Sequence, residues 1–152
     1  MARPAGLSPW MQTVSSHMPH LSRPQAMGLA LWSYGIAITR SCGRSTVATF
    51  LALLLGRKVA NLDQQLYDWC LDASDKAGDS RREVDVTTCF VPLLRWIISL
   101  WTGTHLALAM DATSLSDRFT VLAISVVYRG CAIPVAWTVL PANQKGAWRH
   151  KR

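Results

Sequence analysis

One acid, Asp111, has the strongest potential for chemistry in this sequence because it directly follows an apolar run, residues 106–110. Alternation along a strand would place Asp111 on the same face as the small residues Ala107 and Ala109. A carboxylate at the end of a buried strand is costly unless it has a partner, and such acids often serve as metal ligands, catalytic groups or helix caps. The alternative is that Asp111 only caps a turn over residues 111–114 through its own backbone.

Three β-rich runs position this acid, and the sequence predicts that they form an antiparallel meander. The runs cover residues 105–110, 119–128 and 131–140. Arg129-Gly130 separates the last two runs as a tight hairpin would, since glycine supplies positive φ without strain. The first run is apolar on both faces and is therefore expected to be central, whereas Pro134 cannot donate to a ladder and assigns the third run to an edge.

Helical patterns precede the strands. They cover residues 23–38, 45–56, 61–78 and 91–101, the last with an apolar face expected to be buried. Ser45 and Asn61 are the expected N-caps of the second and third helices, and Gly56 ends the second. Residues 1–24 contain four prolines, a composition that predicts an extended arm.

The composition indicates a folded protein with an anionic partner. The 152 residues are 50% hydrophobic and only 16% charged, which excludes the disordered class. The net charge of +7 favours nucleic acid. Basic groups dominate both ends of the chain: residues 1–62 and 118–152 contain no acid, whereas residues 63–117 contain all nine.

The sequence further predicts a cytoplasmic protein without a membrane partner. Two long apolar stretches, residues 91–110 and 121–140, are each interrupted by Arg and Gly, and the N-terminus does not resemble a signal peptide. A small membrane protein stays open as an alternative on these stretches. The four cysteines lack metal-ligand spacing and are expected to be buried free thiols.

Residues 40–150 resemble bacterial insertion-sequence transposases of the DDE class, most specifically between Asp111 and Trp148. The stretch MDATSLSDRFTVLAISVVYRGCAIPVAWTVLPANQKGAW carries the resemblance, together with REVDVTTCFVPLLRWIISLW before it. The resemblance implies an RNase H-like catalytic domain in which strand one is central and strand three is an edge. Asp111 would then match the first of three catalytic carboxylates.

In that family the three carboxylates hold two Mg²⁺ or Mn²⁺ ions for phosphodiester hydrolysis and strand transfer during DNA recombination. The resemblance therefore implies that Asp111 is a catalytic and metal-binding residue. The second Asp and the Glu would lie downstream, and the sequence given ends at Arg152, so we expect a truncated chain that is inactive alone. Asp117 is expected to be a turn residue or a surface ion-pair partner rather than a substitute.

The N-terminal helices could bind DNA. Arg40, Arg44, Arg57 and Lys58 lie at the ends of two helices that a short Gly-containing turn joins, which suits contact with phosphates. The same pattern also fits an ordinary helical hairpin with solvated ends. The expected partner is DNA at transposon ends.

The prediction as a whole is an α+β chain: an N-terminal helical region followed by the first three antiparallel strands of an incomplete RNase H-like domain. Its parts are an extended arm (1–24), a helical DNA-binding region (25–82), a connecting helix (83–103) and a partial catalytic domain (104–152). The open edge of strand one could promote self-association. The alternative function is a non-catalytic DNA-binding protein or inhibitor derived from a transposase.

Overall fold

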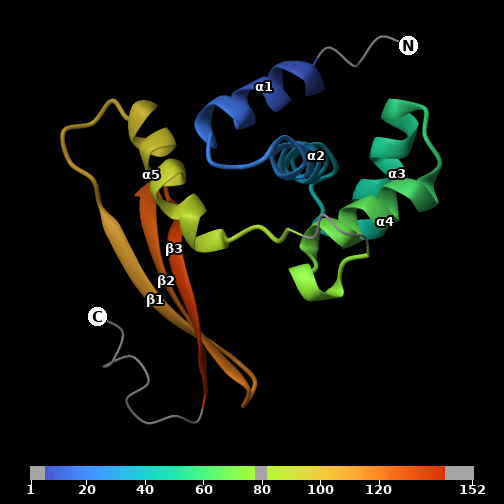
Figure 1. Cartoon of the computed structure of the whole chain (residues 1–152). Helices are drawn as coiled ribbons and strands as arrows, with labels where there is room; N and C mark the ends of the chain where they lie inside the picture. Colours follow the sequence, from blue (N-terminus) through green and yellow to red (C-terminus); the bar gives the residue numbers. More distant parts are fainter. Residues whose placement is uncertain (1–5, 78–81, 143–152) are drawn as a thin grey trace. The chain divides into compact units, whose positions relative to one another are not determined.

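The computed structural model describes residues 6–77 and 82–142, and the chain divides into two compact units at Val86. The first unit is helical, and the second consists of a helix and an antiparallel sheet (Figure 1). The chain is therefore of the α+β class, with all of its described helices before its strands, as predicted. None of the helices in the described residues is both long and apolar enough to cross a membrane.

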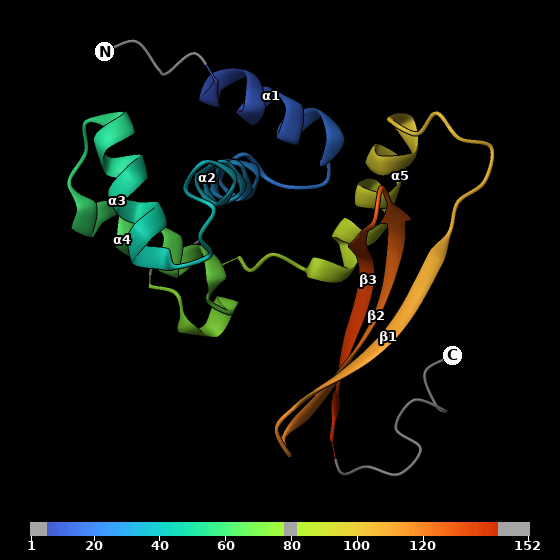
Figure 2. The ribbon, with the colours of Figure 1, turned by 180° about the vertical axis from the view of Figure 1, so that it is seen from behind.

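Four α-helices build the first unit, and α2 lies between α1 and the α3–α4 pair (Figure 2). A short 3₁₀ turn, Ala73–Asp75, follows α4. The helices are α1 (Leu7–His17), α2 (Arg23–Thr39), α3 (Arg44–Leu55) and α4 (Val59–Cys70).

Leucine and valine side chains from all four helices form the core of this unit. Three indole N–H groups connect the helices further: Trp10 donates to Oγ of Ser33 at 2.9 Å, Trp32 to the Leu66 carbonyl at 3.3 Å, and Trp69 to the Gln25 carbonyl at 3.0 Å. These bonds satisfy polar atoms that would be costly to leave unpaired in a half-buried position. The buried cluster comprises Leu7, Leu31, Val47, Ala48, Leu51, Leu62 and Leu66.

The helix α1 lies where an extended arm was predicted. Its apolar residues Leu7 and Val14 are each 1% exposed and the C-cap Met18 is 4% exposed, so these side chains pack inward at helical spacing. Pro9 does not oppose this helix because it falls in the first turn, where backbone N–H groups have no intrahelical partner. The prediction of an arm was wrong because it relied on the number of prolines, whereas the helical spacing of the apolar residues determines the structure here.

Helix ends differ from the predictions in detail. Gly56 ends α3 in the left-handed conformation, as predicted. Ser45 is not the N-cap, because α3 begins at Arg44 after Gly43. Asn61 is likewise inside α4, which begins at Val59 and stops at Cys70, where Leu71 becomes extended.

A 3₁₀ turn (Val86–Cys89) leads into the second unit. This unit has the helix α5 (Phe90–Ser99) and three strands: β1 (Leu108–Leu115), β2 (Phe119–Tyr128) and β3 (Cys131–Pro141). All pairing is antiparallel in the order β1–β2–β3. The predicted meander is confirmed, and among the described residues β3, which contains Pro134, is an edge strand as predicted. The first strand begins later and ends later than predicted.

Strand β1 is not central in the described part of the chain, where it pairs only with β2. All eight of its residues are exposed, including Leu108 at 60% and Met110 at 73%. A strand is buried on both faces only when neighbouring layers cover it, and apolar composition alone cannot supply those layers. The possible self-association through this open edge stays a prediction.

The predicted buried face of α5 is only partly covered. Its residues Trp96 and Ile97 are half-buried, and the following Leu100 is 71% exposed. Two ring contacts attach this segment to the sheet: Phe90 meets Trp137 with ring centroids 4.8 Å apart, and Trp101 meets Tyr128 at 5.3 Å. Aromatic contacts of this kind contribute about 0.5–1.5 kcal/mol each beyond area burial.

None of the four cysteines, all of which the structure describes, forms a disulfide, but they are not buried as predicted. Cys42, Cys70 and Cys131 are exposed and Cys89 is half-buried. Cys70 lies four positions after the buried Leu66, but it is the last residue of α4 and is exposed there.

The β2–β3 hairpin depends on Gly130. Arg129 and Gly130 have φ of 48° and 80°, the two positive values that a two-residue type I′ turn requires, with Tyr128 paired to Cys131. We expect Gly130→Ala to lower the free energy of unfolding by about 1–2 kcal/mol, because a Cβ is strained in this region. Thermal unfolding of the variant would measure the loss. Arg129→Asn is the control, since Asn tolerates positive φ, and an equal loss in both variants would contradict the turn assignment.

Candidate functional site

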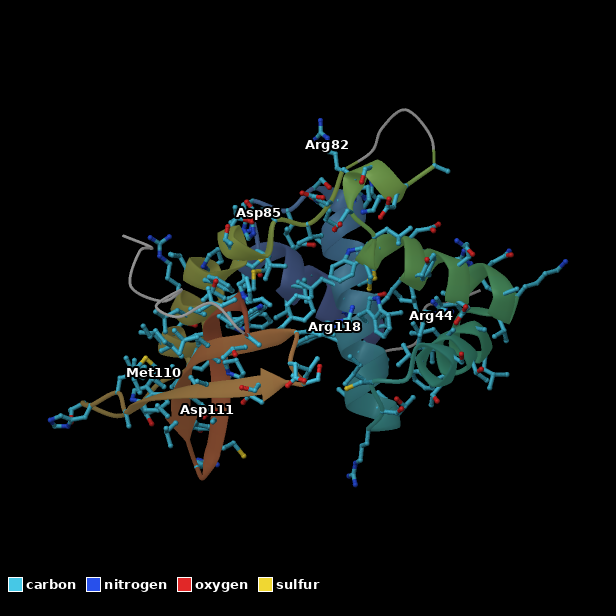
Figure 3. All side chains as sticks on the ribbon, turned by 90° about the horizontal axis from the view of Figure 1, so that it is seen from below. Arg44, Arg82, Asp85, Met110, Asp111 and Arg118 are labelled. Atoms are coloured by element: carbon cyan, nitrogen blue, oxygen red, sulfur yellow. The ribbon has the colours of Figure 1, made fainter. Side chains whose placement is uncertain are left out.

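Asp111 is the fourth residue of β1, and its carboxylate is exposed on one face of the sheet (Figure 3). Across that face it pairs with Ala123 of β2, which in turn pairs with Trp137 of β3. Its Oδ2 accepts a hydrogen bond from Oγ1 of Thr113 at 2.9 Å. The side chain therefore lies on an open surface of small neighbours, with one hydroxyl donor to orient it.

The structure corrects two expectations about this acid. Asp111 lies within a strand rather than at its end, because β1 continues to Leu115. Residues 111–114 are not a turn either, since they pair with residues 120–123 of β2. The turn comes later, at residues 116–118, where Ser116 has a φ of 54°. Asp117 lies in that turn, as expected.

The two divalent ions that the resemblance implies need converging oxygen ligands. In the part of the chain that the structure describes, no three His, Cys, Asp or Glu side chains come together as a group that could hold a metal ion. Asp111 alone, exposed and bonded to a hydroxyl, does not fit a two-metal site.

The four predicted DNA-binding residues lie around α3, as the sequence suggested. Arg40 follows α2 in the left-handed conformation, Arg44 is the first residue of α3, and Arg57 and Lys58 connect α3 to α4. All four are exposed.

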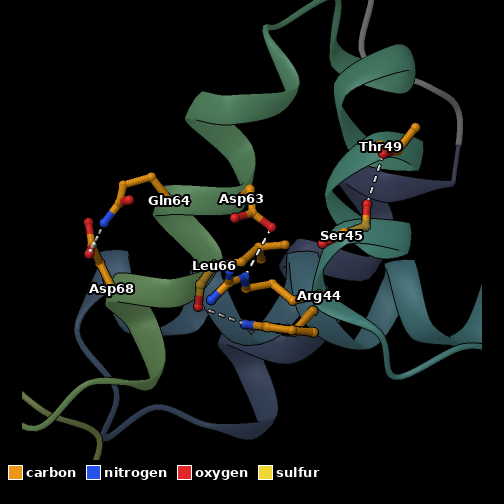
Figure 4. Close-up of polar contacts among 8 residues, drawn as sticks. Arg44, Ser45, Thr49, Asp63, Gln64, Leu66 and Asp68 are labelled. Atoms are coloured by element: carbon orange, nitrogen blue, oxygen red, sulfur yellow. Dashed lines mark hydrogen bonds and ion pairs between the residues drawn. The ribbon is translucent and has the colours of Figure 1, made fainter.

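Arg44 is committed to contacts within the unit (Figure 4). Its Nε lies 3.0 Å from Oδ1 of Asp63, and its guanidinium lies over the ring of Tyr67 at 4.9 Å from the centroid. The side chains of the pair are 42% and 30% exposed, so the ion pair itself contributes little to stability. It neutralises Arg44 locally and positions the start of α3 against α4.

Arg57 has no acidic partner in the part of the chain that the structure describes, and its Nη1 donates to the neutral Oε1 of Gln65 at 2.9 Å. Arg40 and Lys58 form no ion pair with an acid within residues 6–77 and 82–142 either. Three of the four predicted cations are thus available to an external anion, and Arg44 is a positioning residue.

The side chains that contact Arg44 and Arg57 could not be predicted from the sequence. Asp63 lies 19 positions after Arg44 and Gln65 lies eight after Arg57. Only the fold-back of α4 onto α3 brings them together, and a helical pattern does not specify how two helices are aligned.

Comparisons of this chain with protein-family models, with curated proteins and with solved structures found no match. The functional assignment therefore rests on the residues and their geometry.

Proposed function

We propose that this chain belongs to the machinery of DDE-class DNA transposition, as a DNA-binding helical unit joined to the opening strands of an RNase H-like domain. One observation carries the proposal: an antiparallel β1–β2–β3 order in which Asp111 lies on β1 and β3 is an edge. The open edge of β1 would accommodate a further strand, as a fuller sheet of that fold would require.

The same observations favour DNA binding without chemistry by the described residues. Asp111 would be one of several metal-holding carboxylates, and a lone acid cannot hold two cations about 4 Å apart. A non-catalytic DNA-binding protein, or an inhibitor that occupies transposon ends, is the second candidate. The lack of an acid cluster among residues 6–77 and 82–142 supports it.

The test is duplex binding by the whole chain over a range of salt concentrations, with a random-sequence duplex as the probe. Contacts from Arg40, Arg57 and Lys58 predict that the logarithm of the affinity falls with the logarithm of salt concentration with a slope of about −3, because each neutralised phosphate contributes about −0.9. No binding at low salt would overturn the proposal. If the chain binds, selection from a pool of random duplexes would identify any preferred DNA sequence.

A parallel nicking assay on supercoiled plasmid with Mg²⁺ or Mn²⁺ separates binding from chemistry. We expect no metal-dependent nicking, and we expect Asp111→Asn to bind DNA like the wild type because Asp111 lies outside the helical unit. Nicking that disappears in Asp111→Asn would show that the chain performs the reaction itself.

A further inference from the structure

We propose that α3, rather than α4, is the helix that enters the major groove of DNA. This inference rests on the proposed DNA binding and specifies the surface that performs it. In an ordinary helix-turn-helix the second helix reads the groove, and α4 is the second helix of the α3–α4 pair. Charge and exposure in this chain favour the first.

Charge separates the two helices. The sequence has no acid before Asp63, so α3 carries Arg44 and no carboxylate. The helix α4 has no basic residue and carries Asp63 and Asp68, the latter exposed. Asp63 is paired with Arg44, but the exposed Asp68 would still bring a carboxylate close to phosphates if α4 entered the groove, which costs binding energy.

The outward face of α3 is suited to base edges. Val47, Ala48, Leu51 and Ala52 face the core, which leaves a stripe of hydroxyl and apolar side chains on the opposite side. Hydroxyls bond either to bases or to phosphates, and apolar groups contact the methyl of thymine. Leu53 is 81% exposed, and nothing in the described residues covers it. This stripe lines an open groove of about 540 Å³ formed by Thr39, Ser45, Thr46, Thr49, Phe50 and Leu53.

Basic groups bracket the stripe. Arg40 precedes α3 by four residues and neighbours Thr39 in the groove lining, while Arg57 and Lys58 follow the end of α3. Twelve helical residues extend about 18 Å, which exceeds the roughly 12 Å width of the major groove. Cations at both ends can therefore reach the phosphate rows on either side of a groove that the stripe occupies.

The test compares the same added charge on the two helices. Thr49 and Gln64 are both exposed, and each makes one hydrogen bond within its own helix, to the Ser45 carbonyl at 2.8 Å and to Oδ1 of Asp68 at 2.7 Å (Figure 4). We expect Thr49→Glu to weaken duplex binding at least about tenfold, since the new carboxylate would face phosphates and bases. Gln64→Glu should change affinity by no more than about twofold, as surface substitutions outside an interface do.

Thr49→Gln controls for side-chain size without charge, and circular dichroism would establish that each variant is folded. A loss in Gln64→Glu with normal binding in Thr49→Glu would overturn the assignment to α3 and leave the proposed DNA binding intact. A wild-type chain that binds no duplex would overturn both. If Thr49→Glu changed self-association but not DNA affinity, the stripe would be a protein contact, and the proposal would be wrong.

Discussion

Leu51→Ala should lower the free energy of unfolding of the helical unit by about 2–5 kcal/mol. Leu51 is fully buried in α3, and it belongs to a core cluster with residues from all four helices of the unit. Truncation removes its transfer energy and leaves a cavity that packed helices fill only partly. Urea unfolding followed by far-ultraviolet circular dichroism would measure the loss.

Leu53→Ala is the matched control because it makes the same change two positions along the same helix. Leu53 is 81% exposed, so its removal should change the free energy of unfolding by no more than about 0.5 kcal/mol. Similar losses in the two variants would mean that α3 packs through a different face. The DNA assignment would then fail with it, since it depends on the outward position of Leu53.

The sequence correctly predicted the features that depend on the backbone conformation of a single residue. Gly56 ends a helix because glycine adopts positive φ without strain, and Pro134 marks an edge strand because it has no N–H to donate. The turn at Arg129 and Gly130 follows from the same logic. Such residues determine where an element ends whatever surrounds it.

Burial was predicted less well because it depends on what lies next to an element. The apolar composition of β1 suggested a covered central strand, yet its residues are exposed and it pairs on one side only among the described residues. Cys70 was expected to be buried and is exposed. Neither position could be settled from local pattern, because covering layers come from distant parts of the sequence.

For the candidate site too, the sequence predicted the local features and missed those that depend on distant residues. The sequence identified Asp111 as a strand residue and the basic residues around α3, because strand alternation and helix-end charge are readable locally. The sequence did not indicate that Asp63 neutralises Arg44. This ion pair distinguishes Arg44, which positions α3, from the other predicted cations, which remain available to an anion. The proposal that α3 rather than α4 enters the major groove needed the exposure of the side chains in the structure as well as the charges in the sequence.

Gly28→Ala should destabilise the helical unit even though alanine is the better helix former. In an exposed helix this change would gain about 1 kcal/mol. Here a Cβ on Gly28 would overlap Cδ1 and Nε1 of Trp69, whose indole N–H donates to the Gln25 carbonyl at 3.0 Å. The ring can move only by giving up that bond or by pushing α4 away from α2. We therefore expect a net loss of about 1–3 kcal/mol, as for other overpacked sites, measured by urea unfolding and tryptophan fluorescence.

Gly43→Ala is the control for this prediction, because it adds the same methyl where there is room. Its φ is −68°, and the nearest atoms to a new Cβ are Oγ of Ser41 at 3.3 Å and Oγ1 of Thr46 at 3.4 Å, both on side chains that can turn. Gly43 is the N-cap of α3, so alanine should cost less than about 1 kcal/mol there. If Gly28→Ala instead stabilised the protein, as it would in a solvent-exposed helix, the close approach of α4 to α2 would be wrong. The alignment that pairs Arg44 with Asp63 would then need revision, because the same α4 carries both Trp69 and Asp63.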